Sequence, residues 1–167
     1  SIIANGGTTG SGTAVSEEYN GSGWGTGGSM NTTRFYISDF GNSQTAAVAV
    51  NGRSPGETFM NDVEEYNGTS WTTATDTPYN SNNTNTFGIL TAGVAAGGNN
   101  PSAPVAQTVA EYDGTNWTTG GNLNNAGQYG GAVGTQTAMM VAGLYPTNGQ
   151  TEEYNGSSWS NANPMGS

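Results

Sequence analysis

The sequence predicts an all-β protein built from four copies of one antiparallel sheet repeat. Two markers recur in every copy: a Glu-Tyr-Asn/Asp-Gly segment that leads to a tryptophan, and a short apolar run that ends in glycine. No segment shows apolar residues at the 3.6-residue period of an amphipathic helix. The repeat is about 46 residues long, as the spacing of Thr45, Thr91 and Thr137 shows. Because internal repeats of this length are typical of stacked sheet units, they predict a repeat architecture.

The apolar runs predict buried strands. They contain four to six residues, which suits a strand and is too short for a helix. The glycines at their ends tolerate backbone conformations that other residues avoid, so the chain can turn sharply there. The four runs are Ile2–Gly7, Ala47–Gly52, Gly93–Gly98 and Met139–Gly143.

The Glu-Tyr-Asn/Asp-Gly segments predict tight hairpins. Asn-Gly and Asp-Gly accept the positive φ that short hairpin turns require. The tryptophan follows the tyrosine by five residues each time, and this register favours a repeated aromatic core over a platform for stacking sugar rings. We expect all eight aromatic side chains to be buried at equivalent positions: Tyr19 and Trp24, Tyr66 and Trp71, Tyr112 and Trp117, and Tyr154 and Trp159.

Together these markers resemble the kelch repeat: an apolar strand ending in Gly-Gly, a loop, Glu-Tyr, a tryptophan, and an apolar residue six positions later. The resemblance covers the whole chain. It departs from the kelch pattern where an arginine is usual, because only Arg34 is present and Ser81 and Gly127 occupy the other places. It implies a β-propeller with four-stranded antiparallel blades. The innermost strands would then lie in Thr33–Gly41, Thr84–Leu90 and Gln128–Gly134.

By this resemblance residues 1–167 form one repeat domain of about four blades. The blades are expected at 28–75, 76–121 and 122–167, after an incomplete blade at 1–27 that lacks its innermost strand. An open sheet edge recruits other strands. We therefore expect the chain to be a piece of a longer propeller, or to associate with itself as a ring-completing dimer or a fibre. A closed monomeric ring of four blades is the alternative.

The charge balance excludes two classes of partner. The chain has 12 acidic residues, only Arg34 and Arg53 as basic ones, and a formal net charge of −10. Nucleic acids and anionic membrane surfaces both require a basic footprint. No apolar stretch of about 18 residues is present to span a bilayer. The absence of lysine leaves few trypsin sites, which is typical of an extracellular protein, although drift in composition explains it as well.

The residues needed for several chemistries are missing. Without cysteine or histidine there are no disulfides, no thiolate or imidazole metal ligands and no histidine base. Two arginines are too few for a sialidase-like site, and no glycine-rich loop carries the lysine of a phosphate loop. A carboxylate-pair glycosidase stays open in principle. We predict no catalytic residues, no metal and no cofactor.

One set of carboxylates recurs before the repeat tyrosine: Glu18, Glu65, Glu111 and Glu153. A ring of carboxylates suggests Ca²⁺, which prefers oxygen ligands. Copies related by blade rotation lie too far apart to share one ion, so the sequence favours carboxylates that accept hydrogen bonds from backbone or hydroxyl groups.

The loops after the apolar runs vary while the hairpins stay uniform, and binding sites often lie on loops held by a rigid scaffold. They are Thr8–Ala14, Arg53–Asn61, Asn99–Thr108 and Leu144–Gln150. Unconstrained drift is the alternative explanation for their variety. The candidate ligand-binding residues in them are Arg53, Phe59, Met60, Asn99, Asn100, Leu144 and Tyr145.

The segment Glu-Glu-Tyr-Asn-Gly-Ser-Ser-Trp is similar to repeats in virion or tail proteins of marine bacteriophages. This similarity implies a non-enzymatic structural or adhesion module, either extracellular or on a virion. Its partners would be a virion protein or a cell-surface glycan. A carbohydrate-binding lectin is the second hypothesis, and an intracellular kelch adaptor is the third.

Overall fold

The computed structural model describes residues 2–4, 11–103, 105–147 and 149–166, and of residues 2–4 only the backbone. All regular structure in these residues is β-strand and none is helix, as the sequence predicted. In chain order the strands are β1 (Ile2–Ala4), β2 (Ser16–Tyr19), β3 (Trp24–Thr26), β4 (Ser38–Ser43), β5 (Ala46–Arg53), β6 (Phe59–Tyr66), β7 (Trp71–Thr73), β8 (Asn85–Ile89), β9 (Ala92–Ala96), β10 (Val109–Tyr112), β11 (Trp117–Thr119), β12 (Gly131–Thr135), β13 (Ala138–Ala142), β14 (Thr151–Tyr154) and β15 (Trp159–Ala162).

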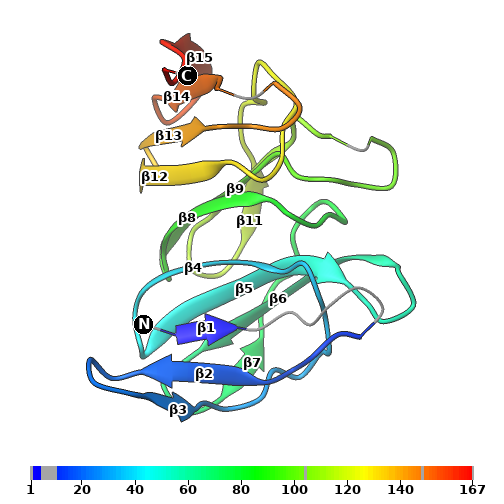
Figure 1. Ribbon diagram of the computed structural model, residues 1–167, viewed down its shortest axis with the longest axis vertical. Coiled ribbons are helices and arrows are strands. Elements are labelled where there is room, and N and C mark those ends of the chain that lie inside the picture. Colours follow the sequence, from blue (N-terminus) through cyan, green and yellow to red (C-terminus); the bar gives the residue numbers. More distant parts are fainter. Residues whose placement is uncertain (1, 5–10, 104, 148, 167) are drawn as a thin grey trace.

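The strands form four antiparallel sheets in which neighbours in sequence are neighbours in space (Figure 1). The first sheet has three described strands, β1 to β3. The other three sheets have four strands each: β4 to β7, β8 to β11, and β12 to β15. The strands of each sheet lie within 1–27, 28–75, 76–121 and 122–167 respectively. Each sheet is therefore one copy of the repeat.

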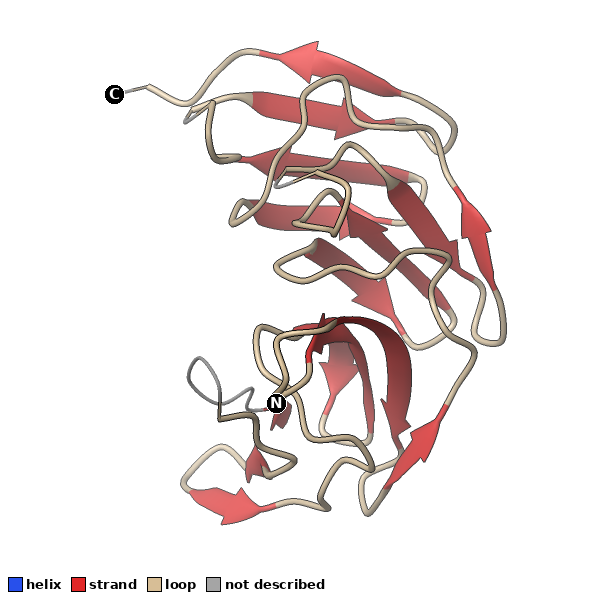
Figure 2. Ribbon diagram, turned by 90° about the vertical axis from the view of Figure 1, so that its right-hand side faces the viewer, coloured by secondary structure: helices blue, strands red, loops and turns tan. Residues whose placement is uncertain are grey.

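The four sheets follow an arc (Figure 2). The first strands of the last three sheets lie side by side on its inner side, β4 beside β8 and β8 beside β12. They overlap the segments in which the sequence placed the innermost strands, although β4 and β12 begin and end later than predicted. Within the described residues the arc is open, and the sheets do not close into a ring.

A glycine near the end of each innermost strand allows that strand to lie close against the next one. Gly88 has φ +141°, and a Cβ added to it would lie 2.4 Å from the carbonyl oxygen of Ala92. Gly41 and Gly134 occupy the same place in their sheets, with φ values of +153° and +129°. Only glycine fits a backbone that is both left-handed and this close to the neighbouring strand.

The core lies between successive sheets. Tyr66 and Trp71 of the second sheet pack with Met30, which follows the first sheet. Phe40 and Val48 of the second sheet pack with Tyr112 of the third. A third cluster joins the third sheet to Tyr154 and Trp159 of the fourth. The repeat aromatics are thus the contact between one sheet and the sheet before it.

The first aromatic pair does not follow the prediction. Tyr19 is 36% exposed and Trp24 is 53% exposed, although their rings still contact each other with centroids 5.2 Å apart. Trp117 is half-buried, and the other five aromatics of the set are at most 6% exposed. The physical reason is that a preceding sheet covers each later pair, and no sheet covers this face in the described part of the chain.

The described residues contain no helix long and apolar enough to cross a membrane.

Candidate functional site

A hydrogen bond from tyrosine to glutamate joins each of the last three sheets to the one before it. The hydroxyl of Tyr112 donates to Glu65 Oε1 at 2.5 Å. The same bond joins Tyr66 to Glu18 and Tyr154 to Glu111. These three glutamates therefore accept hydroxyl hydrogen bonds, as the sequence favoured. No group of three or more acidic residues that could hold a metal ion occurs among the described residues.

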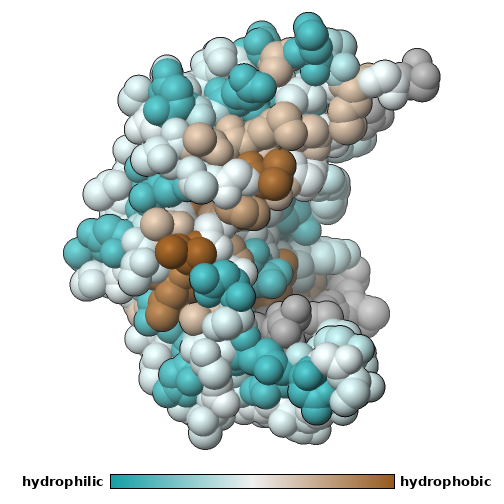
Figure 3. Space-filling view, turned by 90° about the vertical axis from the view of Figure 1, so that its left-hand side faces the viewer, coloured by the Kyte–Doolittle hydropathy of each residue, from teal (hydrophilic) through white to brown (hydrophobic). Residues whose placement is uncertain are grey.

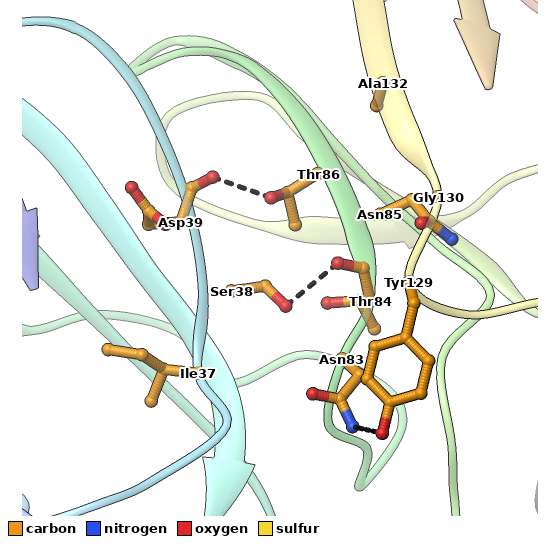
Figure 4. Close-up of a pocket in the computed structure, with 10 residues that line it drawn as sticks. All are labelled: Ile37, Ser38, Asp39, Asn83, Thr84, Asn85, Thr86, Tyr129, Gly130 and Ala132. Atoms are coloured by element: carbon orange, nitrogen blue, oxygen red, sulfur yellow. Dashed lines mark hydrogen bonds between the residues drawn. The ribbon is translucent and has the colours of Figure 1, made fainter. Parts of the chain in front are cut away.

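A polar hollow of about 290 Å³ opens between the innermost strands (Figure 4). Asp39, Thr86 and Ala132 line it from equivalent positions of β4, β8 and β12. Two hydrogen bonds hold its walls together: Ser38 Oγ donates to the Thr84 carbonyl at 2.9 Å, and Thr86 Oγ1 donates to the Asp39 carbonyl at 2.6 Å. The hollow is therefore part of the rigid contact between neighbouring sheets.

A second hollow of about 390 Å³ lies at the other end of the same strands and shares Asp39 and Thr86 with the first. Phe40, Phe87 and Ile89 line it, so it is more apolar. Figure 3 shows the molecule from the side where the β4–β5, β8–β9 and β12–β13 turns lie, with apolar side chains gathered near its middle. The two ends of the inner strands thus differ in chemistry, and the first hollow is the polar one.

Asp39 is the carboxylate that lines both hollows. Although part of its surface reaches solvent, the surrounding protein removes water from its carboxyl, and this desolvation raises the pKa of Asp39. No salt bridge joins Asp39 to either arginine. An Asp39 carboxylate in this position can accept hydrogen bonds from the hydroxyl groups of a ligand.

Two residues in the left-handed conformation, Asn83 and Tyr129, line the polar hollow, and Tyr36 shares their place in the repeat. Tyr36, Asn83 and Tyr129 precede the innermost strands at equivalent positions and have φ of 54°, 53° and 60°. Such values are uncommon outside glycine, and strained residues of this kind cluster at binding sites. The Asn83 side-chain amide donates to the Tyr129 hydroxyl at 3.1 Å (Figure 4). Tyr129 is nevertheless 64% exposed, so its ring stands at the rim of the hollow.

Tyr145, one of the predicted loop residues, lies beside this rim. Its ring centroid is 6.4 Å from that of Tyr129, and 51% of its surface is exposed. Its backbone exchanges hydrogen bonds with Gln128, which holds the loop against the start of the inner strand. The sequence therefore identified one of the two most exposed tyrosines of the site.

Asn99 and Asn100 are half-buried at the start of the loop that follows β9. Asn99 pairs through its backbone with Asn82, the neighbour of Asn83. The side-chain oxygen of Asn100 accepts hydrogen bonds from the backbone of Ser102 and Ala103. Asn100 therefore shapes the loop and has its side-chain oxygen already engaged.

Both ends of the predicted loop Arg53–Asn61 are strand. Arg53 ends β5 and pairs with Phe59, and Met60 pairs with Gly52, so the turn itself is confined to 54–58. The Arg53 guanidinium lies 4.0 Å from the centroid of the Phe59 ring and 3.0 Å from Glu57 Oε2. Arg53 and Phe59 therefore stabilise the strand ends together, and both have partners within the chain.

Leu144 is wrong as a ligand-binding candidate. It is fully buried in the core between the third and fourth sheets. Gly127 allows this close packing, since a Cβ added there would lie 2.5 Å from the Leu144 Cβ. Of the predicted loop Thr8–Ala14, residues 8–10 lie outside the described residues, as do residues 104 and 148 of the later loops.

Sequence reasoning missed Asp39, and it missed the repeated left-handed position of Tyr36, Asn83 and Tyr129, of which Asn83 and Tyr129 line the hollow. Their spacing was a usable signal, because position 83 follows 36 by 47 residues and position 129 follows 83 by 46. The residue type changes between copies, so no repeated letter marked the position. A comparison with protein-family models and with curated protein sequences finds no match for this chain.

Proposed function

We propose that the chain is a non-enzymatic, kelch-like propeller module for adhesion that binds a cell-surface glycan at the mouth of its polar hollow. The sheets are its blades, and β4, β8 and β12 are the innermost strands. The observation that carries the proposal is the exposed pair of Tyr129 and Tyr145 at the rim of that hollow.

The propeller assignment is supported by the order of the strands. Each of the last three sheets is a four-stranded antiparallel meander, and its first strand lies next to the first strand of the neighbouring sheet. This is the arrangement that radial repetition of blades produces. The repeated tyrosine–glutamate bonds act between blades and keep the same geometry along the arc.

Carbohydrate is the ligand class that suits the rim. A sugar presents an apolar C–H face and a set of hydroxyls, and exposed tyrosines present an apolar ring with a polar tip. Tyr129 is anchored by Asn83, so little ring mobility is lost when a ligand stacks on it. The Asp39 carboxylate and the Thr86 hydroxyl lie in the hollow behind the rim, where they can engage ligand hydroxyls.

Binding without hydrolysis is favoured by the lining of the hollow. It offers the single carboxylate Asp39, whereas most glycosidases place two carboxyl groups about 5–10 Å apart across the scissile bond. The composition, which has no lysine or cysteine and a net charge of −10, supports the proposed extracellular or virion location.

A glycan array tests this function. The chain carries a label at an exposed residue away from the loop face, and the array is probed with the wild-type chain and with Tyr129→Ala. We expect a set of related glycans to bind the wild type and to lose signal with the variant. An array without saturable binding would count against the proposal, as would hits that Tyr129→Ala leaves unchanged.

A further inference from the structure

The three contacts between sheets follow one rule. The tyrosine and tryptophan of a sheet face the preceding sheet, and that preceding sheet supplies the glutamate that accepts the tyrosine hydroxyl. In the second of these contacts, Phe40 of the preceding sheet also lies edge-on to Tyr112 and Trp117, with centroids 6.5 and 6.2 Å apart. Each sheet therefore has an aromatic side and an accepting side.

The first sheet exposes its aromatic side. Tyr19 and Trp24 are 36% and 53% exposed, whereas the equivalent Tyr66 and Trp71 are 1% and 4% exposed. Their rings already contact each other as the buried pairs do, with centroids 5.2 Å apart against 5.0 Å for the second pair. This end of the arc thus presents a preformed aromatic pair to solvent.

The fourth sheet exposes its accepting side. Glu153 is exposed, whereas its equivalents Glu18, Glu65 and Glu111 are all half-buried beneath the next sheet. The apolar residues around it are exposed as well: Val133 by 52% and Met140 by 37%. Their equivalents in the second sheet, Phe40 and Val48, are 6% and 0% exposed, because the third sheet covers them.

We propose that the fourth sheet of one copy packs on the first sheet of a second copy, and that Glu153 accepts a hydrogen bond from Tyr19 of that copy. Val133 and Met140 then cover Trp24 of the second copy, as Phe40 covers Trp117 within the chain. The Tyr19 hydroxyl donates to the Gly21 carbonyl at 3.0 Å in the isolated chain and exchanges that bond on association. The occupant is a second copy because the two exposed surfaces are the two halves of a contact that the chain already makes three times.

The contact joins different surfaces of the two copies, so it is heterologous. Such contacts give a ring if the rotation closes and a filament if it does not. Neither surface includes Tyr129 or Tyr145, so every copy keeps its loop face open and the assembly is multivalent for a ligand bound there. The inference therefore goes beyond the proposed glycan binding and does not depend on it.

Net charge opposes this association. Each copy carries a formal charge of −10, and salt screens the repulsion between the copies. The apolar contact and the tyrosine–glutamate bond, in contrast, do not depend on pairing opposite charges. We therefore expect association to strengthen as the salt concentration rises, which is the opposite of assembly through salt bridges.

Sedimentation equilibrium of the 167-residue chain over a range of concentrations and salt tests the inference. The wild-type mass is expected to rise with concentration. Val133→Glu should weaken association about tenfold or more, and Tyr19→Phe about tenfold, which corresponds to about 1.4 kcal/mol. Ile89→Glu is the matched control: it adds the same charge at an exposed apolar residue of an innermost strand, away from both surfaces, and should leave association unchanged.

Two results would overturn the inference. One is a 17.0 kDa monomer at every concentration and salt. The other is association that Val133→Glu and Tyr19→Phe weaken no more than Ile89→Glu does. Circular dichroism of each variant confirms that it is folded, and Tyr19→Phe removes one hydroxyl from an exposed side chain, so at least one variant reports on the contact. Glycan binding measured on the same samples stays intact if only this inference fails.

Discussion

Tyr112 of the third sheet donates a hydrogen bond to Glu65 of the second sheet at 2.5 Å. The ring of Tyr112 is 1% exposed, so the bond lies at the edge of the core and not on the open surface. Because the same bond recurs at Tyr66 and Tyr154, one repeated contact contributes to the orientation of each sheet on the next.

Removal of the Tyr112 hydroxyl should destabilise the chain. A hydrogen bond to a charged group contributes about 1.5–3 kcal/mol, and Tyr112→Phe also leaves the half-buried Glu65 without this partner. We expect a loss of this size in the free energy of unfolding by urea. Tyr145→Phe is the control, since Tyr145 is 51% exposed and its hydroxyl is outside the core. Equal midpoints for the two variants would show that the bond contributes nothing.

The buried tyrosines predict a loss of stability at alkaline pH. Burial, together with the bond to Glu111, raises the pKa of Tyr154 to about 12, and burial also raises the pKa of Tyr66 and Tyr112. An unfolded tyrosine has a pKa of about 10, so this stabilisation is complete below pH ~10 and is lost as the pH rises from there to ~12. Unfolding free energies measured across that range should fall steeply in the wild type and less steeply in Tyr154→Phe. If the unfolding free energies of the wild type and of Tyr154→Phe fell equally with pH, the raised pKa of Tyr154 in the folded chain would be contradicted.

The two arginines should differ in what their removal costs. Arg34 and Glu64 form a buried pair at 3.0 Å with side chains 0% and 1% exposed. Arg34→Met leaves the Glu64 carboxylate buried without its cation and should cost about 3–5 kcal/mol. Arg53→Met breaks the partly exposed pair with Glu57 and should cost less than about 1 kcal/mol. Thermal unfolding of both variants checks this, and similar losses would mean that burial of the Arg34 pair is unimportant.

Tryptophans at equivalent positions should also differ. Trp71 is 4% exposed and donates from its indole nitrogen to Ser16 Oγ at 3.1 Å, whereas Trp24 is 53% exposed. Trp71→Ala should cost about 3–5 kcal/mol through the cavity it leaves. Trp24→Ala should cost about 1 kcal/mol or less at concentrations where the chain is monomeric. A denaturant titration that gives the two variants the same stability would contradict the finding that a preceding sheet covers Trp71 and that none of the described sheets covers Trp24.

Sequence periodicity predicted the strands well because each repeat forms its own local structure. The Asn-Gly and Asp-Gly turns and the short apolar runs determine hairpins and strands regardless of what packs on them. Burial is different, since it depends on a neighbouring sheet. Trp24 follows the same Glu-Glu-Tyr-Asn-Gly segment as Trp71 and is exposed because no described sheet covers it.

The sequence named only some of the residues at the candidate site, for a related reason. Tyr145 stood out as an unusual loop residue, but Leu144 beside it turned inward to fill the space above Gly127. Which of two adjacent side chains faces the core depends on contacts with the neighbouring sheet. Asn83 and Tyr129 at the rim, and Tyr36 at the equivalent position, share one repeated backbone conformation that different residues adopt, and a search for repeated letters does not detect it.

Calorimetric titration of the chain with a glycan that binds on the array tests the central claim most directly. The wild type, Tyr129→Ala, Asp39→Asn and the control Ile89→Ala are compared at concentrations where all four are monomeric. The account predicts that Tyr129→Ala and Asp39→Asn each weaken binding roughly tenfold, about 1.4 kcal/mol, while Ile89→Ala binds as the wild type does. Unchanged affinity in both Tyr129→Ala and Asp39→Asn would contradict the placement of the binding site at the mouth of the polar hollow.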